Sequence, residues 1–574
     1  MSRGRKRNSI PRIAFVGLTI IIQIVWLIVM AVKLNAHSAW ISACVNLLSI
    51  VVVLRLYGRH TSTAMKMPWI MLILAAPVMG LSLFLLFDIL GDPGRAGKRI
   101  RRFREKMDGS LPQDGAVLAR LESENRAAGN QFHYLSVHEN WPVYENTSVR
   151  YLGDGAETLE AMKADLEKAE KFIFMEYFIV ADNSAFQEIR EILVRKARQG
   201  VEVRLMYDDI GSLGFVNLRF ARGLSEDGIR CRVFNPAVPV VNLFLNHRDH
   251  RKTTVIDGKV GYIGGYNLAD EYFGRARPYG VWKDTGLRLE GEAVRSLTAS
   301  FFELWNVTTK EEEDFAHYLN ICHKAESEGF VQPFNDNPLS EERTAENVYL
   351  NLIAQAEKTL YITTPYLIIT DEMSRALRLA AKRGVDVRII TPGIPDKKVV
   401  FAITRSYYSG LARQGVRIYE YTPGFCHAKQ CLCDGEIASI GSSNFDYRSL
   451  YHHFENDVLL YGCDAIGDMA RDFDALFSQC SEAAGLRITE KSKIFCGAYR
   501  QRCAPFLVSW YNPLALPLGE LSPQVTERAL QPHFPSPSSP RSATSPIGRG
   551  KGCLPFPASR RRNRIFCERH FIFL

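Results

Sequence analysis

The sequence carries one pattern of polar residues twice, and this repeat limits the possible folds more than any other feature. In both copies a histidine is followed by lysine at +2, aspartate at +7 and asparagine at +17. The first copy comprises His250, Lys252, Asp257 and Asn267, and the second comprises His427, Lys429, Asp434 and Asn444. Because the chain has only 13 histidines, two chance matches are improbable, and the pattern predicts a duplicated structural unit.

The repeat extends beyond these residues. Residues 200–205 (GVEVRL) are matched by residues 384–389 (GVDVRI), 184 positions later. Short β-rich apolar runs alternate with helix-like segments such as 186–198 and 372–383. This alternation predicts an α/β fold with two tandem lobes, each a mixed sheet covered by helices.

The spacing within each copy has a chemical meaning. On a strand, residues i and i+2 share a face, so each histidine stands beside its lysine. An Asp-Gly turn then folds the chain back and brings the asparagine alongside. Two facing copies would surround an anionic phosphodiester with two imidazoles and two ammonium groups, without a divalent metal. One histidine can attack phosphorus while the other transfers protons.

The positive net charge of +9 belongs to the two ends of the chain. Residues 1–107 carry +13 and residues 481–574 carry +9, whereas residues 108–480 carry −13. A nucleic-acid surface needs concentrated cations, so the acidic body predicts no nucleic-acid partner.

The basic N-terminal end also contains three apolar runs, at residues 13–32, 38–54 and 69–87. They predict a membrane anchor with two or three transmembrane helices within residues 1–107. Basic residues precede the first run and follow the third, from Arg95 to Lys106. Such flanks favour the cytoplasmic side and attract anionic lipid, so we expect a cytoplasm-facing catalytic body.

At this point the sequence resembles the phospholipase D superfamily, in its paired HxKxxxxD motifs that each precede a Gly-rich turn and an asparagine. The apolar runs and the segments 174–178 (FMEYF) and 441–449 (GSSNFDYRS) narrow the resemblance to bacterial cardiolipin synthases, over roughly residues 10–480. The resemblance implies a multi-pass enzyme of the bacterial cell membrane, without a cofactor. It would convert two phosphatidylglycerol molecules into cardiolipin and glycerol through a phosphohistidine.

The resemblance also implies roles for individual residues. His250 would be the nucleophile and His427 the acid and base, or the reverse, while the motif lysines and asparagines bind phosphate. Asp284 and Glu455 would orient the histidines, and Asp257 and Asp434 would be structural members of the motif.

The residues leave two other functions open. The same site could use water, giving a phospholipase or, less in keeping with the acidic body, a nuclease. A membrane scaffold with an inactive site is the second alternative, which the intact histidines and lysines disfavour.

The sequence also predicts the domain boundaries and the roles of several cysteines and acidic residues. The lobes are expected at residues 108–308 and 346–480, with a linker at 309–345 and a degenerate or disordered basic tail at 481–574, which an altered reading frame would also explain. Cys426, Cys431 and Cys433 lie beside His427, but their spacing matches no usual zinc motif, so no metal is predicted. Glu176 and Asp208-Asp209 either line the pocket or serve turns and solubility.

Overall fold

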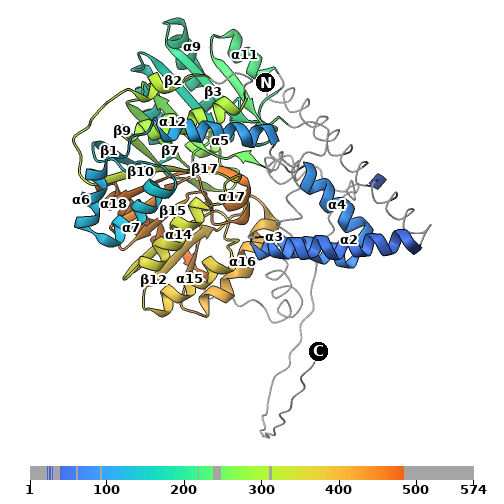
Figure 1. Ribbon diagram of the computed structural model, residues 1–574. Helices are drawn as coiled ribbons and strands as arrows, with labels where there is room; N and C mark the ends of the chain where they lie inside the picture. Colours follow the sequence, from blue (N-terminus) through green and yellow to red (C-terminus); the bar gives the residue numbers. More distant parts are fainter. Residues whose placement is uncertain are drawn as a thin grey trace, which may run out of the picture. The chain divides into compact units, whose positions relative to one another are not determined.

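The structure is a computed structural model of the 574-residue chain. It describes residues 39–59, 62–90, 94–217, 219–236, 247–308 and 313–483, and a few positions between 18 and 29. These residues belong to one compact unit, shown in Figure 1. The expected tail, apart from residues 481–483, lies outside the described residues.

The first lobe contains a seven-stranded mixed sheet in the order β1-β9-β7-β6-β2-β3-β4. Its inner strand β2 pairs in parallel with β3 and antiparallel with β6. The strands are β1 (Thr147–Leu152), β2 (Phe172–Tyr177), β3 (Glu202–Asp208), β4 (Arg230–Phe234), β6 (Lys252–Ile256), β7 (Val260–Gly264) and β9 (Gly286–Gly291).

The second lobe repeats this order as β10-β17-β16-β15-β11-β12-β13, with β18 added at the edge. Its strands are β10 (Phe330–Asp336), β11 (Thr359–Thr363), β12 (Asp386–Pro392), β13 (Arg417–Tyr421), β15 (Gln430–Cys433), β16 (Ile437–Gly441), β17 (His453–Tyr461) and β18 (Cys480–Glu482). The α/β fold with two mixed sheets is therefore confirmed. Strand β10 lies in the expected linker, so the second sheet begins earlier in the chain than residue 346.

Helices cover the sheets because each buries one apolar face. In α9 the buried residues Phe186, Ile189 and Leu193 follow helical spacing, and in α15 the side chain of Thr370 caps the N-terminus. The helices of the body are α5 (Gly94–Asp108), α6 (Gly115–Glu124), α7 (Arg126–His133), α8 (Gly155–Glu167), α9 (Ser184–Arg198), α10 (Asp209–Ser212), α11 (Phe220–Glu226), α12 (Val294–Trp305), α13 (Ala316–Leu319), α14 (Thr344–Gln355), α15 (Asp371–Lys382), α16 (Lys398–Ala412), α17 (Tyr447–His452) and α18 (Asp464–Ser478). Single turns lie at η1 (Tyr134–His138), η3 (Asp270–Phe273) and η4 (Asn306–Thr308).

Short strands join the two lobes directly. Strand β5 (Arg248–Asp249) of the first lobe pairs in parallel with the start of β17. Strand β14 (Gly424–Cys426) of the second lobe pairs in parallel with β8 (Val281–Lys283) of the first. Both pairings lie next to a motif histidine, so the junction between the lobes is also where the two motifs meet.

The motif aspartates stabilise the sheets from the turns after β6 and β15. The carboxylate of Asp257 accepts hydrogen bonds from three consecutive backbone N–H groups at the start of β2, and Asp434 does the same at the start of β11. Both residues have positive φ, 54° and 53°, as the Asp-Gly turns require. The structural role of both aspartates stays a prediction, which these backbone contacts support.

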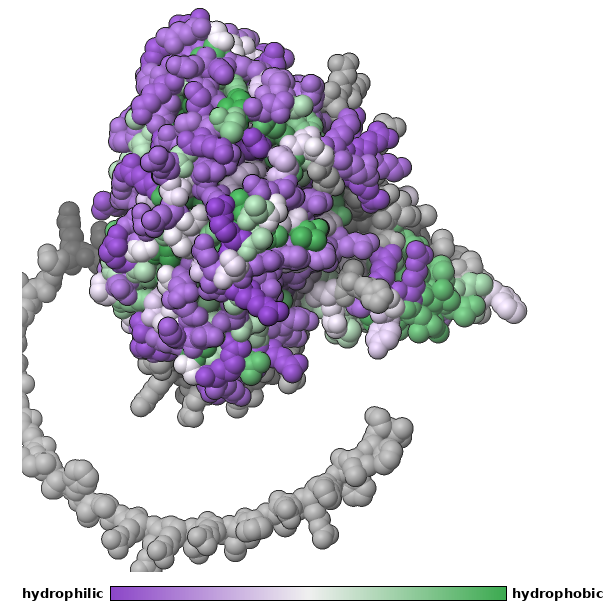
Figure 2. All heavy atoms as spheres, turned by 60° about the vertical axis from the view of Figure 1, so that its left-hand side comes forward, coloured by the Kyte–Doolittle hydropathy of each residue, from purple (hydrophilic) through white to green (hydrophobic). Residues whose placement is uncertain are grey.

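The N-terminal apolar region forms helices where the structure describes it. They are α2 (Ala39–Gly58), α3 (Thr63–Ala75) and α4 (Pro77–Leu90). Their surface includes exposed apolar side chains such as Leu47 and Leu54, each 65% exposed, and Figure 2 shows hydrophobic residues gathered on one projecting part beside a mainly hydrophilic body. Within the described ranges, no helix has both the length and the apolarity needed to cross a bilayer. The first apolar run, 13–32, lies largely outside those ranges, so the transmembrane helices stay a prediction.

Candidate active site

The two motif histidines occupy equivalent places at the junction of the lobes. His250 stands between β5 and β6, and His427 stands between β14 and β15. The backbone N–H of His250 donates to the carbonyl of Phe454 at 2.9 Å, and that of His427 donates to the carbonyl of Lys283 at 2.7 Å. Each histidine is therefore fixed by the backbone of the opposite lobe, at the residue just before an acidic side chain.

Those acidic side chains contact the histidines crosswise. His250 Nδ1 lies 2.9 Å from Glu455 Oε2, and His427 Nδ1 lies 2.6 Å from Asp284 Oδ2. Glu455 belongs to the second lobe and Asp284 to the first, so each imidazole of one lobe is held by a carboxyl group of the other. All four side chains are buried. The sequence singled out the four residues, but only the tertiary structure shows which acid meets which histidine.

The motif lysines complete two His-Lys pairs. Lys429 Nζ lies 2.8 Å from Nδ1 and 3.0 Å from Nε2 of His427, and both lysines donate to the carbonyl oxygen of their own histidine. Burial lowers the pKa of Lys252 to about 7 and that of Lys429 to about 8. An anion bound between the lysines would stabilise their protonated forms.

Burial also favours the neutral form of both imidazoles. Desolvation, together with Lys252, lowers the pKa of His250 well below its usual range. Desolvation and Lys429 lower the pKa of His427 to about 4. The lysine of the opposite lobe, Lys429 for His250 and Lys252 for His427, lowers the pKa of each histidine further. The charges of each motif therefore act on the histidine of the other.

The two carboxyl groups differ in ionisation. Although burial opposes it, His427 and Lys429 hold the pKa of Asp284 below its usual range. Burial instead raises the pKa of Glu455 well above its usual range, even though Ser442 Oγ donates to it at 2.6 Å. The duplicated site is therefore chemically asymmetric, with an ionised acid on His427 and a carboxyl group that favours its proton on His250.

The motif asparagines lie in different surroundings. Asn267 Oδ1 accepts from the N–H of Ile179 at 3.0 Å, and its Nδ2 donates to the hydroxyl of Tyr272 at 2.8 Å. Asn444 Oδ1 is buried and has no hydrogen-bond partner among the described residues. The phosphate-binding role of both asparagines stays a prediction.

Glu176 and Asp208, whose roles the sequence left undecided, make structural contacts. Glu176 is buried against Arg251, with 2.6 Å between Oε1 and Nη2. Asp208 forms a buried ion pair with Arg248 at 2.8 Å and caps α10. Sequence reasoning passed over Arg251 because it lies inside the motif, between His250 and Lys252.

A metal could be held at one place in the described part of the chain. His250, His453 and Glu455 bring potential ligand atoms within 4.8 Å of one another. The three cysteines beside His427 are not part of this set, and burial raises the pKa of Cys426 to about 12, which keeps the thiol protonated. The prediction that no metal is used is not tested by these contacts.

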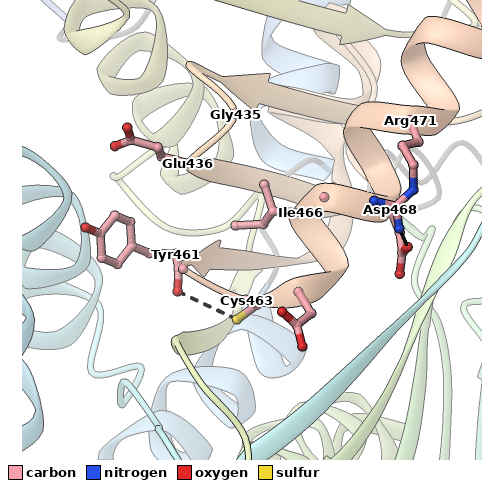
Figure 3. A pocket seen from close by; sticks show the side chains of 10 residues that line it. Gly435, Glu436, Tyr461, Cys463, Ile466, Asp468 and Arg471 are labelled. Carbon is pink, nitrogen blue, oxygen red and sulfur yellow. Dashed lines mark hydrogen bonds and ion pairs between the residues drawn. The ribbon is translucent and has the colours of Figure 1, made fainter.

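A separate hollow of about 500 Å³ lies at the other end of the β15–β16 hairpin from His427 (Figure 3). It is lined by Gly435 and Glu436 of the turn, by Tyr461, and by Cys463 and Arg471 at α18. None of the motif histidines, lysines or asparagines lines it.

A glycine of the motif permits the contact with Asp284. A Cβ atom at Gly265 would lie 1.9 Å from Asp284 Oδ1, which real structures do not allow. We predict that Gly265→Ala displaces this carboxylate and lowers kcat about 10- to 100-fold, because ångström-scale misplacement of a reacting group is costly. Gly223→Ala in α11, where nothing lies within 4 Å of the added atom, is the matched control. Equal activity of the two variants in a steady-state assay would contradict the prediction.

The lysines predict a pH dependence of phosphodiester binding. Because their pKa values are about 7 and 8, the free protein loses both positive charges as the pH rises through this range. We therefore expect kcat/KM to fall above about pH 7 to 8, whereas kcat falls at higher pH because the bound anion retains the protons. Initial rates between pH 6 and 9 test this, and a kcat/KM that stays constant up to pH 9 would contradict it.

Known proteins resemble this chain over most of its length. A family model described as cardiolipin synthase, PLD-like domain, matches residues 162–305 and 349–477, which contain both motifs. A cardiolipin synthase of Halalkalibacterium halodurans is 35% identical over 448 residues, covering 76% of this chain and 87% of that protein. One from Geobacillus kaustophilus is 34% identical, covering 77% and 87%. An uncharacterized protein of Streptococcus mutans is 43% identical, covering 74% and 93%.

A solved structure shares the fold. The phosphatidylserine synthase of Haemophilus influenzae superposes with a TM-score of 0.51 at 15% identity, covering 68% of this chain and all of that one. The duplicated His-Lys site and the extent of the sequence matches lead to the same assignment. The chain belongs to the cardiolipin synthase family, whose members are phosphatidyltransferases of the phospholipase D type.

Proposed function

We propose that the chain condenses two phosphatidylglycerol molecules into cardiolipin and glycerol. The crosswise His250–Glu455 and His427–Asp284 pairs carry this proposal. They place two imidazoles and two lysines from different lobes in one buried site, where neither lobe alone supplies a complete set. This arrangement suits a reaction that needs a nucleophile and a proton donor at one phosphorus atom.

In the first half of the proposed reaction, His250 attacks the phosphorus of one phosphatidylglycerol through Nε2. The bond from phosphorus to the glycerol headgroup breaks, and His427, whose protonated form is favoured by Asp284 and by the anionic phosphate once it is bound, gives its proton to the leaving oxygen. Where His250 Nδ1–H donates to Glu455 Oε2, an oxygen that can accept whether or not the acid carries a proton on its other oxygen, Nε2 keeps the lone pair for the attack. Lys252 and Lys429 balance the negative charge on the phosphoryl oxygens.

In the second half, glycerol leaves and the headgroup hydroxyl of a second phosphatidylglycerol enters. His427, now neutral, takes the hydroxyl proton while the oxygen attacks phosphorus and the bond to His250 breaks. Asp284 stabilises the imidazolium that forms, because its low pKa keeps it ionised. Cardiolipin leaves, and both histidines return to their initial states without a net change in protons.

We also propose that this reaction takes place at the cytoplasmic face of the bacterial membrane. The exposed apolar side chains of α2 and α3 would contact the lipid. Leu54 and Leu74 are examples, because their side chains do not pack in the body. The basic residues that follow in α5 would meet anionic headgroups, which include phosphatidylglycerol itself. The net charge of −13 on residues 108–480 supports a lipid rather than a nucleic acid as partner.

The purified full-length chain, supplied with phosphatidylglycerol alone, tests the proposed reaction. We expect cardiolipin and free glycerol in equal amounts, measured by lipid chromatography and an enzymatic glycerol assay. Phosphatidic acid without cardiolipin would overturn the proposal in favour of a hydrolase that uses water at the same site. Absence of any headgroup release would overturn both.

A further inference from the structure

A buried cluster of charged side chains lies behind the strand that carries His250 and Lys252. Arg251 stands between these two residues, and its side chain is fully buried. Because neighbouring residues of an extended segment point to opposite faces, it points away from the active site. Its guanidinium lies 2.6 Å from Glu176 Oε1 and 3.2 Å from Glu303 Oε2. A third carboxyl group, that of Asp249, lies 3.4 Å from Arg251 Nε, so three carboxyl groups hold the motif strand from behind.

Glu303 in α12 connects three parts of the molecule. Besides Arg251, it accepts a hydrogen bond from Arg104 Nε of α5 at 3.0 Å and from Asn335 Nδ2 of β10 at 2.9 Å. In the sheet register, Asn335 is opposite Asn456, the residue after Glu455. Glu303 therefore joins α5 to the strand of His250 and to the strand pair that holds its acidic partner.

The second lobe shows that a His-Lys strand can be built without such a cluster. In the first lobe His250 is flanked by Asp249 and Arg251. In the second lobe His427 is flanked by Cys426 and Ala428 at the same positions. In β2, Glu176 is paired with the third residue after His250. In β11, Thr363 is paired with the third residue after His427. All three residues of the second lobe are uncharged and buried. Forming such a strand therefore does not require the charges of the first lobe.

The charged cluster of the first lobe is in contact with α5. This helix packs on α12 (Figure 1) with Ile100, Phe103 and Met107 buried, while Arg101 and Arg102 are exposed. The side chain of Arg104 is 22% exposed and lies between these faces. The helix follows the apolar helices α2–α4 in the chain, so it is the element of the body nearest in sequence to the proposed membrane contact.

We propose that Arg104 and Glu303 are positioning residues for phosphatidyl transfer, and that they hold Arg251 so that the packing of α5 sets the orientation of His250 and Lys252. This inference rests on the proposed function for its natural substrate. It does not require Arg104 to touch the substrate. It makes the correct docking of α5 a condition for full activity of one half of the duplicated site.

The electrostatics of Glu303 give the inference a measurable signature. Although burial opposes ionisation, Arg104 and Arg251 hold the pKa of Glu303 below its usual range. Without Arg104, the buried carboxylate keeps Arg251 as its one arginine partner among the described residues, and it takes up a proton at a higher pH. Its hold on Arg251 then weakens as the pH falls, so the variant should lose activity on the acid side first.

The test compares Arg104→Met and Arg104→Lys with a control, Arg120→Met. Arg120 lies in α6, and its replacement breaks an exposed ion pair with Glu145. Rates are measured on the full-length chain with phosphatidylglycerol and with bis(p-nitrophenyl) phosphate, a water-soluble phosphodiester. For Arg104→Met we expect kcat to fall about tenfold with KM within twofold, and the acid limb of the pH profile to move to higher pH. Arg104→Lys should recover most of kcat, and Arg120→Met should match the wild type.

Two results would overturn the inference: an unchanged kcat and pH profile in Arg104→Met, or a lysine variant as impaired as the methionine variant. If Arg104→Met does not fold, the nearly isosteric Glu303→Gln decides, since a wild-type kcat there also overturns it. The soluble diester separates the two proposals. A wild type that cleaves the diester but forms no cardiolipin refutes the proposed function, while the effect of Arg104 on the diester can still be measured.

Discussion

Replacing either motif histidine with alanine should abolish turnover. His250→Ala and His427→Ala are each expected to reduce kcat by at least about 10,000-fold, because the nucleophile and the proton donor act as one unit. The double variant should be no worse than either single variant, since removing one member already stops the reaction. Cardiolipin formation from phosphatidylglycerol in purified enzyme measures this effect.

The variants also distinguish the roles of the two histidines. His427→Ala lacks the proton donor that glycerol needs to leave, but p-nitrophenolate leaves without a proton, so bis(p-nitrophenyl) phosphate should leave a p-nitrophenyl phosphoryl adduct on His250, detected by mass spectrometry of quenched enzyme. An adduct on His427 in His250→Ala would reverse the assignment. His133→Ala, which removes an exposed imidazole paired with Glu122, is the control. Activity in the double variant would refute histidine catalysis altogether.

Neutralising the cross-lobe acids should have the second-largest effect. Asp284→Asn and Glu455→Gln are each expected to reduce kcat about 100- to 10,000-fold. Both replacements keep the shape of the side chain but offer an amide in place of a carboxyl group, so the imidazole loses its hold on the correct tautomer. Asp227→Asn, which removes a surface ion pair with Arg190, controls for loss of a carboxylate.

The crosswise contacts make a more specific prediction for the same variants. Asp284→Asn should change the titration of His427, in the other lobe, and leave that of His250 almost unchanged, as followed by NMR of labelled histidine. Because the carboxylate of Asp284 raises the pKa of His427, its loss should lower that pKa further. A change confined to His250 would contradict the pairing seen in the structure.

The fold could be predicted from the sequence because its signals are local and repeated. Strand-like runs such as 172–177 and 359–363, Asp-Gly turns and amphipathic helices recur at matching positions in both copies. A repeat of this kind determines the type of each lobe, and the observed strand orders agree with it. The start of the second lobe was less predictable, because β10 pairs with β17, more than a hundred residues later in the chain, and its own sequence (FVQPFND) does not indicate this partner.

The members of the site could also be predicted, but their pairing could not. His250, Lys252, His427 and Lys429 follow from spacing within one strand, which is a local property. Asp284 and Glu455 were identified only through the resemblance, and nothing in the sequence shows that each lies beside the histidine of the other lobe. That arrangement depends on the pairing of β5 with β17 and of β14 with β8, which are contacts between distant segments.

The sequence by itself determined that this protein has two equivalent α/β lobes, each with one His-Lys pair, because periodicity and spacing are properties of the chain. Only the tertiary structure decided that the two pairs are unequal. His427 and Lys429 of the opposite lobe keep Asp284 ionised although burial opposes it, whereas burial favours a proton on Glu455 even beside Lys252 of the opposite lobe. The cluster around Arg251 backs one motif with charges where the other has Cys426 and Ala428. These differences arise from desolvation and from contacts between distant residues, and neither is encoded in a repeated motif.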